Sequence, residues 1–300
     1  MSNIKWTLGP PPYKHQNKAP PYKKVCIGIR GHYGDIMISE PGLRNFIKQN
    51  PETKIVFAVS KKYEDILPLF KNYHENIIEL KAFEGYAEWP TSKDLEYIKE
   101  QDFDAMFPPD IPKHPEFYWP RYRHIVEETS FMIGLEIPND KKINLPLPNG
   151  ITKEPKTAAI HMFSSQWPNG VRSIDIPKQE LIVEYLKQKG YEKVYQISSP
   201  EQPHIKGTIF PKGGTYYEAC LRTLSTDILV SCDSGMVFLA SAFNHPTLGL
   251  YSTAYNQAFA TTKHCQPINK NAIYMEGYIA SRIPIEQIYE AVDKVIEISK

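Results

Sequence analysis

Residues 226–254 (TDILVSCDSGMVFLASAFNHPTLGLYSTA) constrain the fold more than any other part of the chain. The apolar run at 227–231 is typical of a buried strand, Asp-Ser-Gly at 233–235 is a turn signal, and the apolar octet at 236–243 is typical of a helix. Asn-His-Pro at 244–246 ends that helix, and a second strand follows at 247–251. A strand, a tight turn, a helix and a strand in this order predict an α/β unit.

The turn of this unit is a candidate ligand site. In an open parallel sheet it lies at the carboxyl edge of the strands, where ligands bind. Gly235 allows close approach to the backbone, the hydroxyl of Ser234 can donate to a phosphate oxygen, and free N–H groups of the first helical turn, such as that of Met236, attract phosphate. A diphosphate would fit here, although an ordinary helix capped by Ser234 has the same local sequence. Asp233 either binds a sugar hydroxyl or holds the turn.

The same alternation of strands and helices runs through most of the chain. Strand-type runs at 24–29, 54–59, 76–80 and 103–107 belong to a first half, and those at 157–163 and 193–197 begin a second. Among the helices expected in the first half are one at 63–70, after the second of these strands, and one at 121–133, after the fourth. This predicts an α/β fold with parallel sheets covered on both faces. Prolines between 146 and 155 mark the linker. We expect an extended arm at 1–23, domains at 24–150 and 151–283, and a final helix at 284–300.

The first strand also ends in a glycine-bearing turn that carries one acid. Residues 30–35 read Arg-Gly-His-Tyr-Gly-Asp and precede an amphipathic helix expected at 36–49. Gly31 and Gly34 permit positive φ, so the turn can be tight and the side chains of His32 and Asp35 can project into a cleft. The turn is neither a dinucleotide fingerprint nor a P-loop, because the required glycine and lysine spacing is missing.

Composition limits the classes of partner. The 300 residues carry 35 Lys and Arg against 34 Asp and Glu, a formal charge of +1 that gives no overall attraction to nucleic acid or to anionic membranes. The four cysteines are far apart and predict reduced thiols without a metal site. No apolar run reaches the length of a membrane span. We therefore expect a cytoplasmic protein with at most peripheral membrane contact.

Two stretches together resemble a known family. Residues 34–43 (GDIMISEPGL) and the following 46–51 (FIKQNP) are similar to the N-terminal signature of the ADP-heptose:lipopolysaccharide heptosyltransferases of glycosyltransferase family 9. Residues 233–236 (DSGM), with Leu239-Ala240 and the strand that ends at Leu250-Tyr251, are similar to the donor-site signature of that family. Both stretches occur in the order and separation found there.

The resemblance implies the GT-B fold, in which two Rossmann-like domains with parallel sheets face each other across a cleft. It places the acceptor in the N-terminal half and the nucleotide sugar in the C-terminal half, with a final helix that commonly packs back on the N-terminal domain. It implies an inverting transfer that uses no metal and no cofactor other than the nucleotide-sugar substrate. The acceptor would be a hydroxyl of lipopolysaccharide or of another glycan.

The resemblance also implies roles for the first turn. Asp35 matches the proposed general base, which takes the proton of the acceptor hydroxyl as that oxygen attacks the anomeric carbon. The competing role of Asp35 is to cap the first helix. His32, Tyr33 and Gly34, which precede it in the same turn, are the candidate acceptor-binding residues.

On the donor side, the helix start at Ser234, Gly235 and Met236 would stabilise the departing diphosphate with its N–H groups. Arg172 would supply a positive charge, and the remaining candidates are Asp233 and the serines that follow the strand at 157–163, Ser164 and Ser165.

Two departures leave the donor sugar open. Phe238 stands where the family usually has His, and Ser252-Thr253-Ala254 stands where it usually has Gly-Pro-Thr. The donor is therefore expected to be ADP-heptose or another nucleotide sugar.

Two alternatives keep this scaffold. In one, the acceptor is DNA that bears a modified base, contacted by the lysine-rich arm and by residues 121–124 (RYRH), although the net charge of +1 argues against it. In the other, the chain is a non-catalytic protein that binds a nucleotide sugar.

Overall fold

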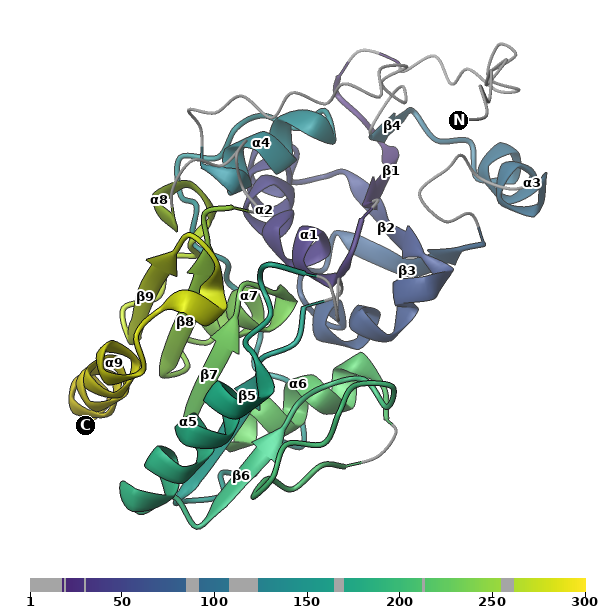
Figure 1. The fold of residues 1–300 in the computed structure, drawn as a ribbon. Helices are drawn as coiled ribbons and strands as arrows, with labels where there is room; N and C mark the ends of the chain where they lie inside the picture. Colours follow the sequence, from purple (N-terminus) through teal and green to yellow (C-terminus); the bar gives the residue numbers. More distant parts are fainter. Residues whose placement is uncertain are drawn as a thin grey trace, which may run out of the picture.

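The structure of the chain, a computed structural model, describes residues 18, 20–29, 31–84, 92–107, 124–164, 170–211, 214–254 and 262–300. Most of the arm at 1–23, the Pro-rich loop at 108–120, residues 121–123 and Ser165 lie outside the described residues. Within the described residues the chain forms two parallel sheets with helices around them (Figure 1).

The first sheet has four strands in the order β3-β2-β1-β4, all parallel. Its central strands are apolar runs without a polar face, which suits a sheet covered on both sides. In chain order the elements are β1 (Lys24–Ile29), α1 (Tyr33–Ile38), α2 (Glu40–Gln49), β2 (Lys54–Ser60), the 3₁₀ helix η1 (Lys61–Phe70), β3 (Ile77–Phe83), α3 (Ser92–Glu100), β4 (Ala105–Phe107) and α4 (Ile125–Met132).

The second sheet has five parallel strands in the order β6-β5-β7-β8-β9. The predicted strand, turn, helix and strand of residues 226–254 are β7, α7 and β8. In chain order the elements are β5 (Thr157–His161), α5 (Ile176–Gln188), β6 (Lys193–Gln196), α6 (Tyr216–Ser225), β7 (Ile228–Cys232), α7 (Gly235–Ala242), β8 (Thr247–Ser252), α8 (Thr262–Cys265), β9 (Ala272–Gly277), η2 (Ala280–Arg282) and α9 (Ile285–Ile298).

Several helices differ from the sequence expectation. The helix expected at 36–49 is divided at Ser39 into α1 and α2, because Pro41 lacks a backbone N–H and its ring crowds the preceding turn. The helix expected at 63–70 is the 3₁₀ helix η1, which contains Pro68 and a non-helical Tyr63. The helix expected at 121–133 is described from Ile125 as α4.

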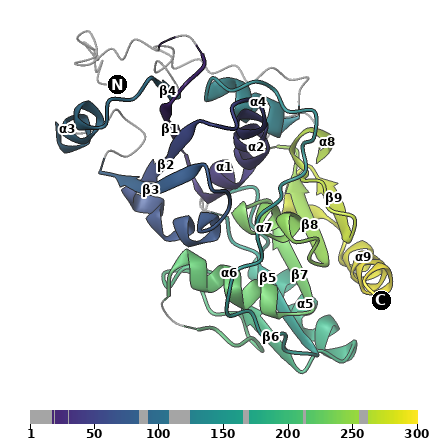
Figure 2. The same cartoon turned by 180° about the vertical axis from the view of Figure 1, so that it is seen from behind.

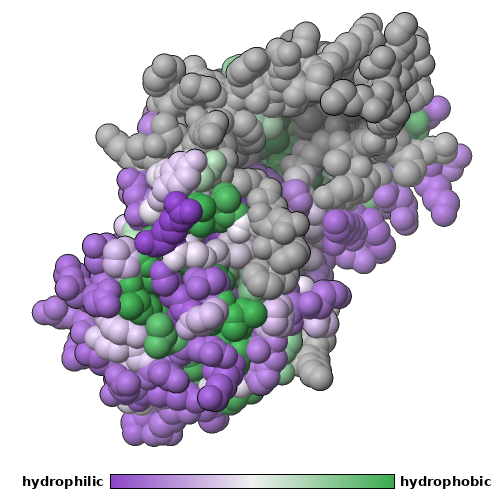
Figure 3. Space-filling view, viewed as in Figure 1, coloured by the Kyte–Doolittle hydropathy of each residue, from purple (hydrophilic) through white to green (hydrophobic). Residues whose placement is uncertain are grey.

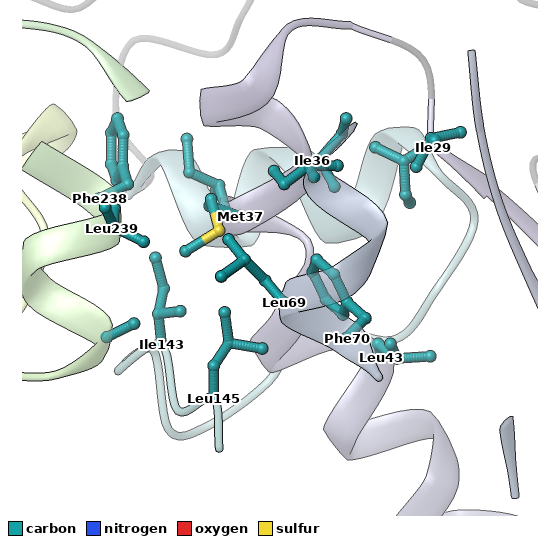
Figure 4. Packing of buried hydrophobic residues seen from close by; sticks show 14 of the residues in the cluster. Ile29, Ile36, Met37, Leu43, Leu69, Phe70, Ile143, Leu145, Phe238 and Leu239 are labelled. Carbon is teal, nitrogen blue, oxygen red and sulfur yellow. The ribbon is translucent and has the colours of Figure 1, made fainter. Parts of the chain in front are cut away.

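One hydrophobic cluster joins the two halves of the molecule. Ile36 and Met37 of α1 lie in the same cluster as Phe238 and Leu239 of α7, and all four are buried (Figure 4). The cluster continues into the first sheet through Ile29 and into the segment after α4 through Ile143 and Leu145. Because helices of both halves share this core, α1 and α7 contact each other directly.

The final helix lies on the second sheet. Ile288 and Val292 of α9 are buried in the hydrophobic cluster of β5, β7 and β8, and the carboxylate of Asp293 accepts a hydrogen bond of 2.8 Å from the hydroxyl of Tyr185 on α5. The resemblance implied packing on the first domain, whereas α9 flanks β8 and β9 (Figure 2). We propose that residues 24–150 and 151–300 are the two domains, with the helix at 284–300 part of the second.

The surface of the second domain seen in Figure 3 is mainly hydrophilic, with hydrophobic residues scattered among polar ones. Among the helices described, none has the length and apolar character needed to cross a membrane.

Candidate active site

The two glycine-bearing turns of the sequence meet in space. The turn after β1 leads into α1, the turn after β7 leads into α7, and these helices contact each other. A Cβ atom at Gly34 would lie 3.6 Å from the Cα of Gly235 and 3.6 Å from Cδ2 of Phe238. The carboxyl edges of both sheets therefore converge on one place, and Gly34 touches Gly235 there.

Asp35 occupies the third position of α1. Its Oδ2 accepts a hydrogen bond of 2.7 Å from the backbone N–H of His32, the residue that precedes the helix. This hydrogen bond belongs to a capping box, in which the side chain of the third helical residue bonds to the backbone N–H of the residue before the helix. The Asp35 side chain remains 37% exposed. Asp35 therefore supports the start of the helix and also presents a carboxylate to solvent, so the two roles considered for it are compatible.

Gly31 makes the position of Asp35 possible. Its φ is +126°, and a Cβ atom there would meet the Asp35 carboxylate oxygen at 2.6 Å. Gly34, by contrast, lies inside α1 with helical geometry, so positive φ is required at Gly31 alone. The glycine at position 34 instead allows the close approach of α7.

The three candidate acceptor residues have different environments. His32 is 62% exposed, and its ring lies 5.5 Å from the ring of Tyr63. Tyr33 is engaged at the domain contact, where its ring stacks on that of Tyr216 with centroids 3.7 Å apart. Gly34 is in contact with the second domain. Of the three, His32 alone is exposed.

On the donor side, Ser234 caps α7. Its Oγ accepts a hydrogen bond of 3.3 Å from the N–H of Met236 and lies 3.2 Å from the hydroxyl of Ser231. The side chain of Met236 is buried, so its contribution to a ligand site is limited to the backbone. Asp233 is buried too, and its N–H donates to the carbonyl of Leu250 at 3.0 Å, which ties the turn to β8.

Arg172 and Asp233 are brought together as an ion pair. The Arg172 Nη1 lies 3.8 Å from Oδ2 of Asp233, and the Arg172 side chain is 16% exposed. The loop before α5 therefore carries its guanidinium to the carboxyl end of β7. An arginine held beside this turn can neutralise phosphate charge.

Ser164 has a buried position. It is 1% exposed, its N–H donates to the Ser173 hydroxyl at 2.9 Å, and the two hydroxyl oxygens lie 3.1 Å apart. Its side chain thus joins the ends of the loop that carries Arg172. Ser165 lies outside the described residues.

Phe238, one of the two departures from the family pattern, has a packing role. It is buried in the shared hydrophobic cluster and lies against Gly34. Residue 238 therefore contributes to the contact between the domains.

His124 is the one described residue of the basic group considered for DNA contact. Its Nε2 lies 3.0 Å from the carbonyl oxygen of Gln266, and burial lowers its pKa. It therefore joins the start of α4 to the segment that follows α8.

Buried titratable groups lie near this region. Burial lowers the pKa of His161, whose Nδ1 lies 2.6 Å from the carbonyl oxygen of Ile197, and raises the pKa of Cys232 to about 12. The four cysteines are unpaired and buried. Among the described residues, no three His, Cys, Asp or Glu side chains are placed to hold a metal ion together.

Sequence reasoning missed two residues at this contact. Asp65 of η1 accepts hydrogen bonds both from Tyr33 and from the backbone of Tyr216, the first residue of α6. Nothing in the local sequence distinguishes Asp65 from other acids of an amphipathic segment. Its partner Tyr216 is 151 residues away, so the pairing depends on how the domains meet.

No family model matches the sequence, and no curated protein matches it. Solved structures do match over nearly the whole chain. A glycosyl transferase family 9 protein from Veillonella parvula aligns with a TM-score of 0.69 at 15% identity, over 92% of this chain and 97% of its own.

Two Escherichia coli enzymes align similarly. ADP-heptose lipopolysaccharide heptosyltransferase II has a TM-score of 0.67 at 13% identity and covers 92% of this chain and 98% of its own. Heptosyltransferase WaaC, solved with ADP, has a TM-score of 0.64 at 12% identity and covers 91% of this chain and 99% of its own. The protein therefore has the GT-B fold of the family 9 heptosyltransferases, as its two turn motifs predicted.

Proposed function

We propose that the protein is an inverting glycosyltransferase that moves a sugar from a nucleoside diphosphate to a hydroxyl acceptor. The observation that carries the proposal is the meeting of two turns in a family 9 fold. One turn presents the partly exposed carboxylate of Asp35, and the other begins α7 beside the guanidinium of Arg172.

The first turn would supply the base. Asp35 takes the proton of the acceptor hydroxyl, and the oxygen attacks the anomeric carbon of the donor sugar. The bond from that carbon to the diphosphate oxygen breaks, and the diphosphate leaves with the electron pair. Attack on the face opposite the leaving group inverts the anomeric centre. His32, which is exposed and precedes Asp35 in the same turn, would contact the acceptor.

The second turn would receive the leaving group. The N–H groups at the start of α7, at Gly235 and Met236, carry partial positive charge, and Arg172 adds a full charge close by. Together they can offset the charge that develops on the diphosphate, and we propose that no metal ion is needed for this step. Asp233 holds Arg172 in place through the ion pair described above.

We propose a glycan or lipopolysaccharide as the acceptor and ADP-heptose or a related nucleotide sugar as the donor. This choice is supported by the fold and by the solved heptosyltransferases, one of which was solved with ADP. The site is proposed to work in the cytoplasm, where nucleotide sugars are made.

A ligand screen followed by a turnover assay tests the proposal. Thermal unfolding would be measured with ADP, UDP and GDP and with their sugars, because a ligand present at 100 times its dissociation constant adds about 2.7 kcal/mol to the free energy of unfolding. We expect one nucleotide to raise the Tm, and we expect its sugar to be hydrolysed slowly without acceptor. Binding without hydrolysis or transfer would favour a non-catalytic binder, and no stabilisation by any nucleotide would contradict the proposal.

A further inference from the structure

A single carboxylate joins the two domains next to the meeting turns. Oδ1 of Asp65 accepts a hydrogen bond of 2.7 Å from the hydroxyl of Tyr33, and its Oδ2 accepts one of 2.6 Å from the backbone N–H of Tyr216. The two tyrosine rings stack with centroids 3.7 Å apart and planes inclined by 2°. Asp65 and Tyr33 belong to the first domain and Tyr216 to the second, so both the stack and one hydrogen bond cross the boundary.

The chemistry of these contacts makes them strong. The N–H of Tyr216 is one of the first-turn donors of α6 that have no partner within the helix, and a carboxylate is favoured at that end of the helix dipole. Hydrogen bonds to a charged acceptor are stronger than neutral ones. Burial and the neighbouring Asp65 raise the pKa of the Tyr33 phenol, which therefore stays protonated and able to donate.

These contacts lie directly beside the two turns. Tyr33 immediately precedes Gly34, and a Cβ atom at Gly235 would lie 3.3 Å from Cβ of Tyr33 and 3.1 Å from the hydroxyl of Tyr216. The Cα side of Gly235 thus lies against both tyrosines, and Asp65 accepts a hydrogen bond from each of them. A shift of either tyrosine would move the Asp35 turn relative to the Ser234 turn.

We propose that Asp65 is a positioning residue, which clamps Tyr33 and Tyr216 together and so holds the domains in the closed arrangement needed for transfer. The proposal rests on the proposed function for its catalytic consequence. The clamp itself is a property of the fold and can be measured without any substrate.

Cys220 provides a built-in probe of the clamp. It lies one turn after Tyr216 on α6 and is buried in the shared hydrophobic cluster, where burial holds its pKa well above the usual value of a thiol. Opening at the clamp would expose this thiol and allow it to react. Cys26 of β1 and Cys232 of β7 are also buried but belong to strands within each sheet, so they report general loosening instead.

The experiment measures the alkylation rate of each cysteine in the native protein by peptide mass mapping. In Asp65→Ala we expect Cys220 to react roughly tenfold to a hundredfold faster, the effect on an opening equilibrium of losing a hydrogen bond to a charged group. Cys26 and Cys232 should react at the wild-type rate. Asp65→Asn keeps one acceptor oxygen, so the alkylation rate of Cys220 should be intermediate. This variant replaces Asp65→Ala in the experiment if the alanine variant does not fold.

Glu64→Ala is the matched control, because Glu64 is the neighbouring carboxylate of η1 and makes an exposed ion pair with Lys61. Its cysteines should react as in the wild type. An unchanged rate of Cys220 in both Asp65 variants would overturn the clamp. An equal increase at all three cysteines would overturn it too, because Asp65 would then support stability in general.

A second measurement separates the clamp from the proposed function. The donor turn lies wholly in the second domain, so Asp65→Ala should lower kcat at least tenfold while the Kd of the nucleoside diphosphate changes less than twofold. A parallel loss of kcat and nucleotide affinity would contradict a positioning role. If no transfer is found with the wild type, the proposed function fails while the cysteine result still decides on the clamp.

Discussion

The backbone of Gly34 lies so close to Gly235 that a Cβ atom at Gly235 would be 3.1 Å from the Gly34 nitrogen. The reverse relationship is looser, because a Cβ atom at Gly34 would make only ordinary contacts of 3.6 Å with the second domain. A side chain at position 235 would therefore crowd the contact between the domains, whereas one at position 34 would make only ordinary contacts.

This asymmetry predicts that substitution by alanine destabilises the protein at Gly235 but has little effect at Gly34. Gly235→Ala should lower the free energy of unfolding by about 1–3 kcal/mol, because the backbone of Gly34 and side-chain atoms of Tyr33 and Tyr216 must move to make room. Gly34→Ala should stay within about 1 kcal/mol of the wild type, because alanine is favoured over glycine in a helix. Urea denaturation of both variants measures this, and equal losses would show that the close approach at Gly235 does not matter.

Alanine substitutions at Gly31 and Gly190 distinguish the effect of backbone strain from the effect of displacing Asp35. Gly31 has a φ of +126° and Gly190 a φ of +95°, so alanine at either should cost about 1–2 kcal/mol of stability. A Cβ atom at Gly190 would meet nothing within 4 Å, whereas one at Gly31 would displace the Asp35 carboxylate. We expect a larger loss of stability in Gly31→Ala than in Gly190→Ala, because Asp35 must also move, and a loss of transfer only in Gly31→Ala. Full transfer by Gly31→Ala would contradict the importance of that carboxylate position.

Fold class and most elements could be predicted because they depend on local pattern. The apolar runs of β1 and β7, and the turn residues after them, predict their own structure and their place at the carboxyl edge of a sheet. The strand β9 was missed because it is a half-exposed edge strand, whose sequence AIYMEG gains its structure from pairing with β8. Pro41 was also underestimated, and it divides the first helix.

The site could be predicted only in part. Asp35, Arg172 and the Ser234 turn were proposed as site residues from the sequence, and their roles stay predictions, while the structure brings Arg172 next to Asp233. The contacts of Asp65 could not be predicted, because one of its partners lies in the other domain. Ser164 was chosen as a loop serine, but no local signal indicates that its hydroxyl is buried against Ser173.

Arg172 should contribute to nucleotide affinity. Replacing it in Arg172→Met removes a charged donor from the end of β7, and we expect the Kd of the preferred nucleoside diphosphate to rise roughly tenfold to a hundredfold. The control is Arg222→Met, the same substitution at an arginine of α6 that forms an ion pair with Glu154. Isothermal titration calorimetry would measure both. Equal affinities in the two variants would remove Arg172 from the donor site.

His245 should make the protein sensitive to acid. It is 3% exposed, and burial is the main cause that lowers its pKa to about 3. Because the folded state resists protonation, the unfolded state binds the proton first as pH falls below about 6.5. The contribution of His245 to the free energy of unfolding is therefore fully present above that pH and is lost as pH falls towards 3.

The test compares the wild type with His245→Asn in urea denaturation between pH 7 and pH 4. Below about pH 6, the free energy of unfolding of the wild type should fall more steeply than that of the variant, by about 1.4 kcal/mol per pH unit. Two parallel pH profiles would show that His245 is protonated equally in both states.

The central claim is that Asp35 is the base of a transfer reaction, and Asp35→Asn tests it most directly. The amide oxygen of asparagine can still accept the hydrogen bond from the His32 backbone, so the helix start and the fold should be preserved. The measurement is single-turnover transfer from the nucleotide sugar found in the ligand screen, with nucleotide affinity measured on the same sample. We predict that transfer falls at least about a hundredfold while nucleotide affinity stays at the wild-type value. Transfer at the wild-type rate by Asp35→Asn would contradict the account.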